Sequence, residues 1–226
     1  MGRPMHPFFR LCARLAVLAA VVAAVAVAAP AAYAADPAGT VAYTAGVVAI
    51  EAAGGAKRFA VAGSAVESGD TVQTMKNAEA VLLMSDHQRI YLKGDTVYRI
   101  DDYRFAEQDP QRNVSVSSLL KGGLRVISGL IGKQGNPDAY QLKTQTATIG
   151  IRGTEWSVLE CGIECPSGES GEHLRVYHGT IDVRNEVDHL ELSEGYGTII
   201  RSPHGTFGTM PATSVKPVVP SPAACR

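Results

Sequence analysis

The sequence predicts an all-β protein in which many short strands form a wound β-sandwich or roll, with solenoid-like stacking as a local variant. Runs of β-forming residues recur roughly every ten residues between Thr40 and Arg201, and turn residues separate them. The string Gly-Asp-Thr-Val occurs at 69–72 and again at 94–97. In this string glycine suits a turn and the β-branched residues suit the strand that follows. Long helical periodicity is missing, so we expect no core helix.

Apolar and β-branched runs predict strands on both sides of a charged loop, 106–113, that contains a proline. In the first half these strands are Thr40–Thr44, Val47–Glu51, Phe59–Ala62, Thr71–Thr74, Ala80–Met84, Gln88–Lys93 and Thr96–Ile100. In the second half they are Gly123–Ile127, Tyr140–Lys143, Thr148–Ile151, Glu155–Glu160, Leu174–Tyr177, Thr180–Arg184, His189–Leu192 and Thr198–Arg201. The stretch between them, 113–121, is the one place where we expect a helical turn.

The segment 146–156 carries the most informative pattern. It predicts a strand with Ala147, Ile149 and Ile151 on one apolar face. Unbroken alternation would place Glu155 in the core and turn Trp156 away from it. A bulge at Gly153 adds one residue, reverses the register and returns Trp156 to the apolar side, so we expect a bulge there.

Arg152 lies between two glycines, Gly150 and Gly153, and has two interpretations. It is either a structural residue that binds loop carbonyls or an acid at a kink, or an interaction hot spot beside Trp156. We favour the structural interpretation, because buried arginines are usually paired for architectural reasons. Trp156, the only tryptophan, is expected in the core.

Four strings follow one another along the chain: Val66–Thr74, Ala80–Asp86 with Ile90–Leu92, Leu120–Val126 and Ile149–Thr154. In this order they resemble the FecR-like domains, which are named for a periplasmic regulator of ferric-citrate transport. The resemblance extends from about Thr40 to Thr154 and continues weakly to about Arg201. One departure is His87, which stands where the family usually has glycine.

The resemblance implies a non-enzymatic periplasmic module that binds, scaffolds or receives a signal, with an envelope protein as partner. It implies no cofactor and no catalytic residue. Its motif maps onto structural or interaction residues, namely Gly150, Arg152, Gly153, Thr154 and Trp156. Regulatory members carry a cytoplasmic segment that controls a sigma factor. Only fourteen residues precede the apolar run here, so we expect a stand-alone exported form.

The N-terminus has the sequence features of a targeting segment. Three arginines precede an apolar run, 15–29, and Ala32-Tyr33-Ala34 fits a small-x-small cleavage site. We therefore expect a signal peptide at 1–34, a β domain at 35–201 and a proline-rich flexible tail at 202–226, with a periplasmic or secreted mature protein. The alternative is an uncleaved anchor at 15–32, and membrane contact is expected only in that case.

Charge excludes one class of partner. Removal of three arginines leaves 18 basic residues of 21 against 22 acidic ones, so the net charge of the mature chain is −4. No basic block is interleaved with aromatic residues, and nucleic acid is not an expected partner. No motif of a nucleophile elbow, a phosphate loop or a metalloprotease is present either, so we expect no enzyme.

The cysteines leave alternatives open. Cys161 and Cys165 are expected to form a local disulfide in an oxidising compartment, while Cys225 stays unassigned. The same two thiols with His173 and His178 could instead hold zinc, which defines a metal-binding alternative. A cell-wall or carbohydrate-binding module is the other alternative, although aromatic residues are only 6% of the chain.

Overall fold

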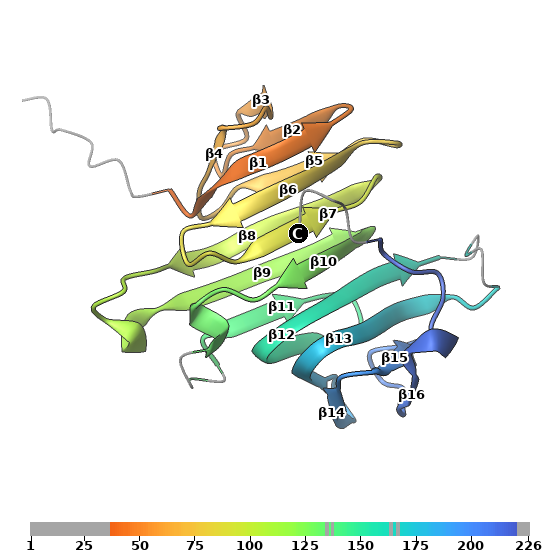
Figure 1. Cartoon of the computed structure of the whole chain (residues 1–226). Helices are drawn as coiled ribbons and strands as arrows, with labels where there is room; N and C mark the ends of the chain where they lie inside the picture. The colour runs from red at the N-terminus through yellow and green to blue at the C-terminus, as the bar shows by residue number, and fades with distance from the viewer. Residues whose placement is uncertain (1–36, 134–135, 137, 163–164, 166–167, 221–226) are drawn as a thin grey trace, which may run out of the picture. The chain divides into compact units, whose positions relative to one another are not determined.

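Within the described residues, sixteen strands form one hydrogen-bonded sheet that curls so that two arms face each other (Figure 1). The computed structural model describes residues 37–133, 136, 138–162, 165 and 168–220. The expected signal segment lies outside them. No helix in the described part is long and apolar enough to cross a membrane.

The first arm runs from the sheet edge in the order β3, β2, β5, β8, β9, β11. These strands are β3 (Lys57–Phe59), β2 (Val48–Glu51), β5 (Thr71–Thr74), β8 (Thr96–Arg104), β9 (Val114–Lys121) and β11 (Tyr140–Lys143). The second arm runs in the order β4, β1, β6, β7, β10. Its strands are β4 (Ala65–Val66), β1 (Gly39–Ala45), β6 (Glu79–Met84), β7 (Arg89–Leu92) and β10 (Gly123–Ile127). Only the β9–β11 pair is parallel among the described strand pairs.

The two arms meet on one long strand, β12 (Thr148–Cys161). The beginning of β12 pairs with β11, its later part pairs with β10, and its other edge pairs along most of its length with β13 (Gly171–Arg184). A strand has only two hydrogen-bonding edges, so β11 and β10 share one of them and the sheet forks along β12. The fork produces the two layers that enclose the core.

The core lies between the arms, because alternate residues of their strands point inward. Inward-facing residues of both arms form one buried cluster that includes Trp156. Representative members are Ile50, Val72, Ile100 and Leu142 from the first arm and Val41, Leu82, Ile90 and Val126 from the second. Each such side chain contributes about 1.5–3 kcal/mol through its burial.

The C-terminal part continues from β13 through β14 (His189–Ser193) and β15 (Tyr196–Ile200) to the short β16 (Met210–Pro211). Three 3-10 turns complete the described elements: η1 (Pro110–Arg112), η2 (Ile131–Lys133) and η3 (Ala212–Ser214). After η3 the chain buries Val215 and then Val219, which packs on the outer side of the sheet against Val81 and Tyr91. Sequence composition led us to expect a flexible tail from residue 202 onward; within it, these two valines cover apolar surface.

The all-β, wound architecture is confirmed, and most predicted strands are present. The helical turn expected at 113–121 is wrong, because these residues form β9 between β8 and β11. The two strands predicted within 148–160 form one bulged strand, β12. Likewise, the two strands predicted within 174–184 form one bulged strand, β13. Gly179 caused the second error: it resembles a turn residue but lies within β13, with a positive φ, opposite the bulge of β12.

Candidate functional site

The fork of the sheet coincides with the bulge predicted at Gly153. The register between β12 and β13 shifts between Arg152 and Glu155, and Gly153 has a φ of +64°. Trp156 and Val158 are consequently fully buried, so the predicted reversal of faces is confirmed. Gly179 lies opposite with a φ of +76°, and a Cβ at this position would come within 2.5 Å of the Gly153 carbonyl oxygen.

Thr154 secures the bulge through Ser128, which directly follows β10. The Thr154 amide donates to Ser128 Oγ at 2.9 Å, and the Ser128 amide donates to the Thr154 carbonyl at 2.9 Å. The Ser128 hydroxyl lies 2.8 Å from the same carbonyl and 3.0 Å from Thr154 Oγ1. Sequence analysis missed Ser128, because no local pattern distinguishes this serine from one at an ordinary strand end. Thr154 thus has a structural role where the two arms separate.

The outward side of the same strand carries Gly150 and Arg152, which face away from the buried Ile149 and Ile151. Because Gly150 has no side chain, it leaves a hollow of about 160 Å³. The hollow is lined by residues of β11, β12 and β13 and by Asp138. We call this surface the Arg152 face and define it by Gln141, Gly150, Arg152, Asp182 and Arg184.

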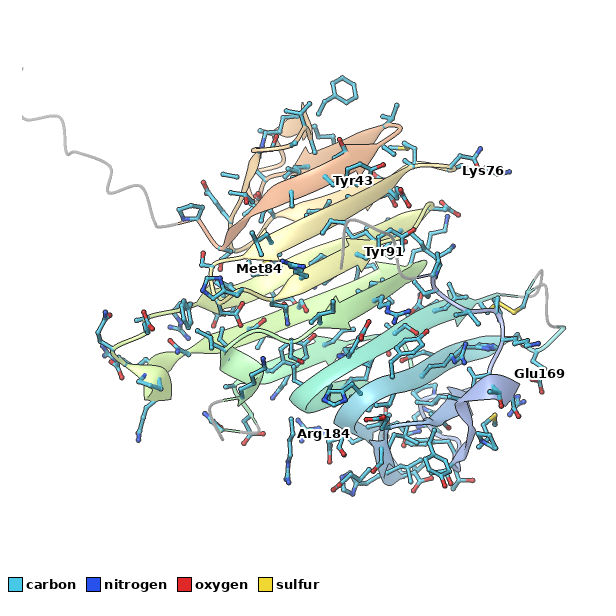
Figure 2. All side chains as sticks on the ribbon, in the orientation of Figure 1. Tyr43, Lys76, Met84, Tyr91, Glu169 and Arg184 are labelled. Carbon is cyan, nitrogen blue, oxygen red and sulfur yellow. A yellow bond between two sulfur atoms is a disulfide. The ribbon has the colours of Figure 1, made fainter. Side chains whose placement is uncertain are left out.

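Arg152 is exposed, and its guanidinium has no hydrogen bond or ion pair with any residue that the structure describes. This exposure does not fit the interpretation of Arg152 as a structural residue bound to loop carbonyls or an acid. The bulge is held by backbone geometry and Ser128 instead, so it needs no guanidinium. Arg184, which projects from the end of β13 in Figure 2, is equally exposed and without such a partner among the described residues. Sequence analysis did not single out Arg184.

The acid of the Arg152 face, Asp182, is already engaged. Asp182, which pairs in register with Gly150, binds His189 Nε2 at 2.5 Å. Arg125, by contrast, is satisfied: its Nε and Nη2 donate to Glu155 Oε1 at 2.9 and 2.6 Å, and it stacks 3.7 Å from the Tyr177 ring centre. Arg152 and Arg184 therefore carry positive charge on the Arg152 face that no described residue pairs.

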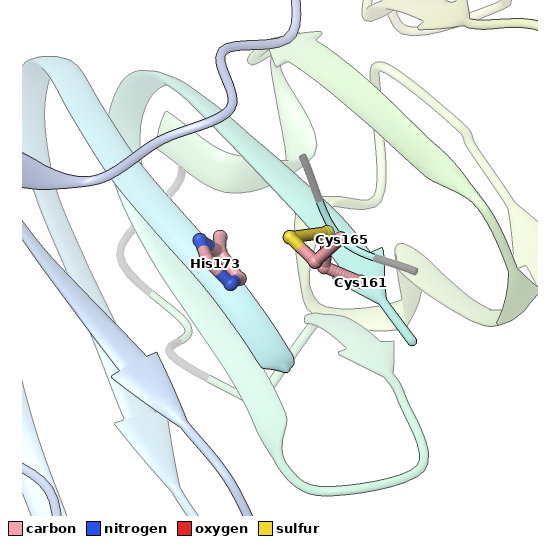
Figure 3. Close-up of side chains that lie close together, drawn as sticks. All are labelled: Cys161, Cys165 and His173. Carbon is pink, nitrogen blue, oxygen red and sulfur yellow. A yellow bond between two sulfur atoms is a disulfide. The ribbon is translucent and has the colours of Figure 1, made fainter. Parts of the chain in front are cut away.

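The cysteine prediction can be followed in Figure 3. Cys161 and Cys165 form a disulfide with a Cα–Cα distance of 5.1 Å. His173 is buried beside it, and one ring nitrogen and both sulfur atoms lie within 4.8 Å of one another. His178 is elsewhere, exposed and 3.0 Å from Glu194 Oε2. The four-ligand zinc alternative is therefore not supported, because both sulfur atoms are bonded to each other and His178 is not part of the group.

A buried carboxyl, Glu172, lies one residue before His173 and was not anticipated. It pairs across the strands with Glu160, and its Oε2 accepts hydrogen bonds from Thr144 Oγ1 at 2.5 Å and from Thr146 Oγ1. Its Oε1 is buried without a hydrogen-bond partner among the described residues. Burial raises the pKa of Glu172 to about 7, against the lowering effect of the two threonine hydroxyls.

His87, the departure from the family pattern, adopts a φ of +69° in the turn between β6 and β7. This left-handed conformation explains why glycine suits the position, since an L side chain is strained there.

A search of curated proteins found no match to this chain. Two crystal structures of a protein from Parabacteroides distasonis ATCC 8503, provisionally described as an anti-sigma factor, are similar at 12% and 14% identity. Their TM-scores are 0.47 and 0.49, and each match covers 62% of this chain. The chain spans 59% of the length of those solved chains.

The sequence model of the family described as FecR protein matches residues 70–183, which is half of the chain. The matched range includes the fork of the sheet, the Gly153 bulge and four of the five residues of the Arg152 face; Arg184 lies just beyond its end. It also reaches further along β13 than the strong part of the resemblance expected from the sequence, which ended at Thr154. The chain belongs to the FecR protein family.

Proposed function

We propose that this protein is a non-enzymatic, signal-receiving module of the cell envelope that binds a partner protein through the Arg152 face. Family membership supports the regulatory role, since the domains that the sequence resembles receive signals in the periplasm. We also propose that residues 1–34 are a cleaved signal peptide and that residues 35–201 form the functional domain.

The observation that carries the proposal is the pair of guanidinium groups, Arg152 and Arg184, on either side of the hollow above Gly150. Neither has a partner among the described residues, although arginine forms strong paired hydrogen bonds with carboxylates. An acidic side chain of a partner fits this arrangement, because it would complete charges that the folded domain leaves unpaired. The hollow is too small for a drug-sized ligand, which occupies about 300–1,000 Å³.

The test begins with a photo-crosslinking amino acid at Gln141 in the mature protein within its own envelope, followed by mass spectrometry of the captured partner. Binding of the purified partner is then measured for Arg152→Glu and Arg184→Glu. Loss of a charge-assisted contact and its replacement by repulsion should weaken binding at least about tenfold. The matched control is Arg201→Glu, because Arg201 is exposed and pairs with Glu169 outside the Arg152 face.

Two results would contradict the proposal. Unchanged affinity in both Arg152→Glu and Arg184→Glu would show that the partner binds elsewhere. Recovery of wall polymer without any protein would favour the carbohydrate-binding alternative.

A further inference from the structure

The edge of the first arm, strand β3, presents a surface that the family motif does not include. β3 lies at one end of the sheet and, among the described strands, pairs with β2 alone. Its three residues, Lys57, Arg58 and Phe59, are all exposed. The edge of β3 that faces away from β2 therefore offers backbone donors and acceptors to an added strand.

Beside this edge lies a row of exposed apolar side chains. Phe59 is 79% exposed, Val61 62%, Val47 51% and Met75 38%. The strand register aligns them, because Phe59 pairs with Ala49, the Ala60 amide donates to the Val48 carbonyl, and the Met75 amide donates to the Val47 carbonyl. We call these four residues the outer apolar patch.

The patch lies on the outward side of the sheet. Val48, Ile50 and Ala60, which alternate with the patch residues along their strands, are buried in the core. Side chains of this size grouped on the outside of a soluble domain are typical of an interaction site. Two lysines border the patch: Lys57 on β3 and Lys76, which projects from the turn between β5 and β6 in Figure 2.

We propose that β3 and the outer apolar patch bind an extended peptide strand of a partner protein, which adds to the sheet edge. The strand would place two apolar side chains beside Phe59 and Val61 and an acidic side chain beside Lys57. Recognition would combine main-chain hydrogen bonds along β3 with alternate side-chain contacts, as in other cases of strand addition.

Charge argues for this occupant over a second copy of the chain. Antiparallel pairing of two β3 strands centred on Arg58 would place the two Arg58 residues opposite each other, and like charges opposite each other destabilise a pair. Arg58 is also held in place by Asp70 Oδ2 at 3.0 Å and the Ala65 carbonyl at 2.9 Å. Among the residues that the structure describes, Lys57 is bound only by Glu51, at 3.1 Å, in a pair whose two side chains are about half or more exposed. Such a pair is weak enough to exchange for a partner's acid.

This inference does not depend on the proposed function of the Arg152 face, since β3 and β12 lie at opposite ends of the first arm. The two surfaces can therefore be tested separately: Arg152→Glu should leave strand addition at β3 unchanged.

The probe is a fluorescein-labelled amidated peptide, Gly-Val-Thr-Val-Thr-Glu-Thr, and its matched control carries lysine in place of glutamate. Fluorescence anisotropy with the mature protein should show the acidic peptide binding about fivefold more tightly, as expected for one cross-strand charge pair. Phe59→Ser should weaken binding roughly tenfold, and Lys57→Glu should reverse the preference between the two peptides. Hydrogen exchange at the Lys57 and Phe59 amides should slow when the acidic peptide is bound.

Phe59→Ser is expected to fold normally because the ring is mostly exposed, and far-ultraviolet circular dichroism checks this. Absence of peptide binding, or binding that neither Phe59→Ser nor Lys57→Glu alters, would overturn the inference. So would a wild-type dimer in sedimentation velocity that Phe59→Ser dissociates, which would identify a second copy as the occupant. Phe59-dependent binding to phosphatidylglycerol vesicles would identify a bilayer instead and would equally overturn it.

Discussion

Glu172 should make the stability of this protein depend on pH, and the variant Glu172→Gln should remove that dependence. The carboxyl is buried on β13, opposite Glu160, and receives two threonine hydroxyl bonds on one oxygen only. The other oxygen has no partner among the described residues. Burial without full compensation disfavours the ionised form, as the raised pKa indicates.

The size of the effect follows from the pKa difference. The pKa of Glu172 rises from 4.5 to about 7 on folding. At about 1.4 kcal/mol for each pKa unit, the difference corresponds to about 3 kcal/mol. Because the folded pKa is the higher one, the native state binds the proton more tightly. The contribution is complete below about pH 4.5 and is lost as the pH rises through 7.

The measurement is urea unfolding of wild type and Glu172→Gln at intervals from pH 4 to pH 8. Relative to wild type, the variant should gain about 3 kcal/mol of unfolding free energy across this range, because glutamine stays neutral. The matched control is Glu107→Gln, an identical chemical change at an exposed residue. Parallel curves for wild type and Glu172→Gln would refute the reasoning, since they would mean that the carboxyl does not titrate on unfolding in this range.

Four further predictions concern the bulge, the core, the disulfide and the N-terminus. Trp156→Ala should lower the unfolding free energy by about 4 kcal/mol, since the indole is fully buried, and this is measurable by urea unfolding. Gly179→Ala should cost about 2 kcal/mol or more by the same assay, because its φ is +76° and its Cβ would meet the Gly153 carbonyl at 2.5 Å. Reduction of the Cys161–Cys165 disulfide should cost about 2 kcal/mol, the chain-entropy value for so short a loop. N-terminal sequencing of the exported protein should begin at Ala35.

Controls separate these effects from general damage. Gly195→Ala is the partner of Gly179→Ala: its φ is +82°, but nothing lies within 4 Å of the added Cβ, so it should cost only about 1 kcal/mol. Equal losses in the two variants would rule out the close approach at the bulge. Cys225→Ser should leave the effect of reductant unchanged if the loss comes from the loop disulfide. Retention of residues 15–32 in the exported protein would favour the anchor alternative.

Local pattern was sufficient for much of the fold. Alternation in the segment 146–156 required a bulge at Gly153, because otherwise Glu155 and not Trp156 would be buried. The same logic failed for 113–121, where several serines made the strand look polar. Ser117 and Ser118 are buried in β9, whose backbone pairs with β8 and β11, and no local pattern reveals these distant neighbours. Gly179 was taken for a turn residue for a related reason: only its pairing with β12 shows that it lies inside a strand, opposite the bulge.

For the candidate site, too, local sequence patterns predicted one part and distant neighbours in the structure decided the rest. Sequence analysis located Gly150, Arg152, Gly153 and Thr154, but it assigned Arg152 a buried structural role. The structure instead exposes that side chain, and the bulge is held by Ser128, which lies 26 residues before Thr154 in the chain and binds it. Arg184 joins the same face only through the pairing of β12 with β13.

Periodicity and turn chemistry thus determined by themselves that the chain would be a wound β structure with a bulge at Gly153, whereas the cysteine spacing favoured a local disulfide only together with an oxidising compartment. These features depend on residues close together in sequence, where spacing decides geometry. Tertiary structure alone decided where the sheet forks, which charges stay unpaired, and which carboxyl group is buried. Each of these depends on which distant strand lies alongside, and burial and electrostatic environment are properties of the packed whole.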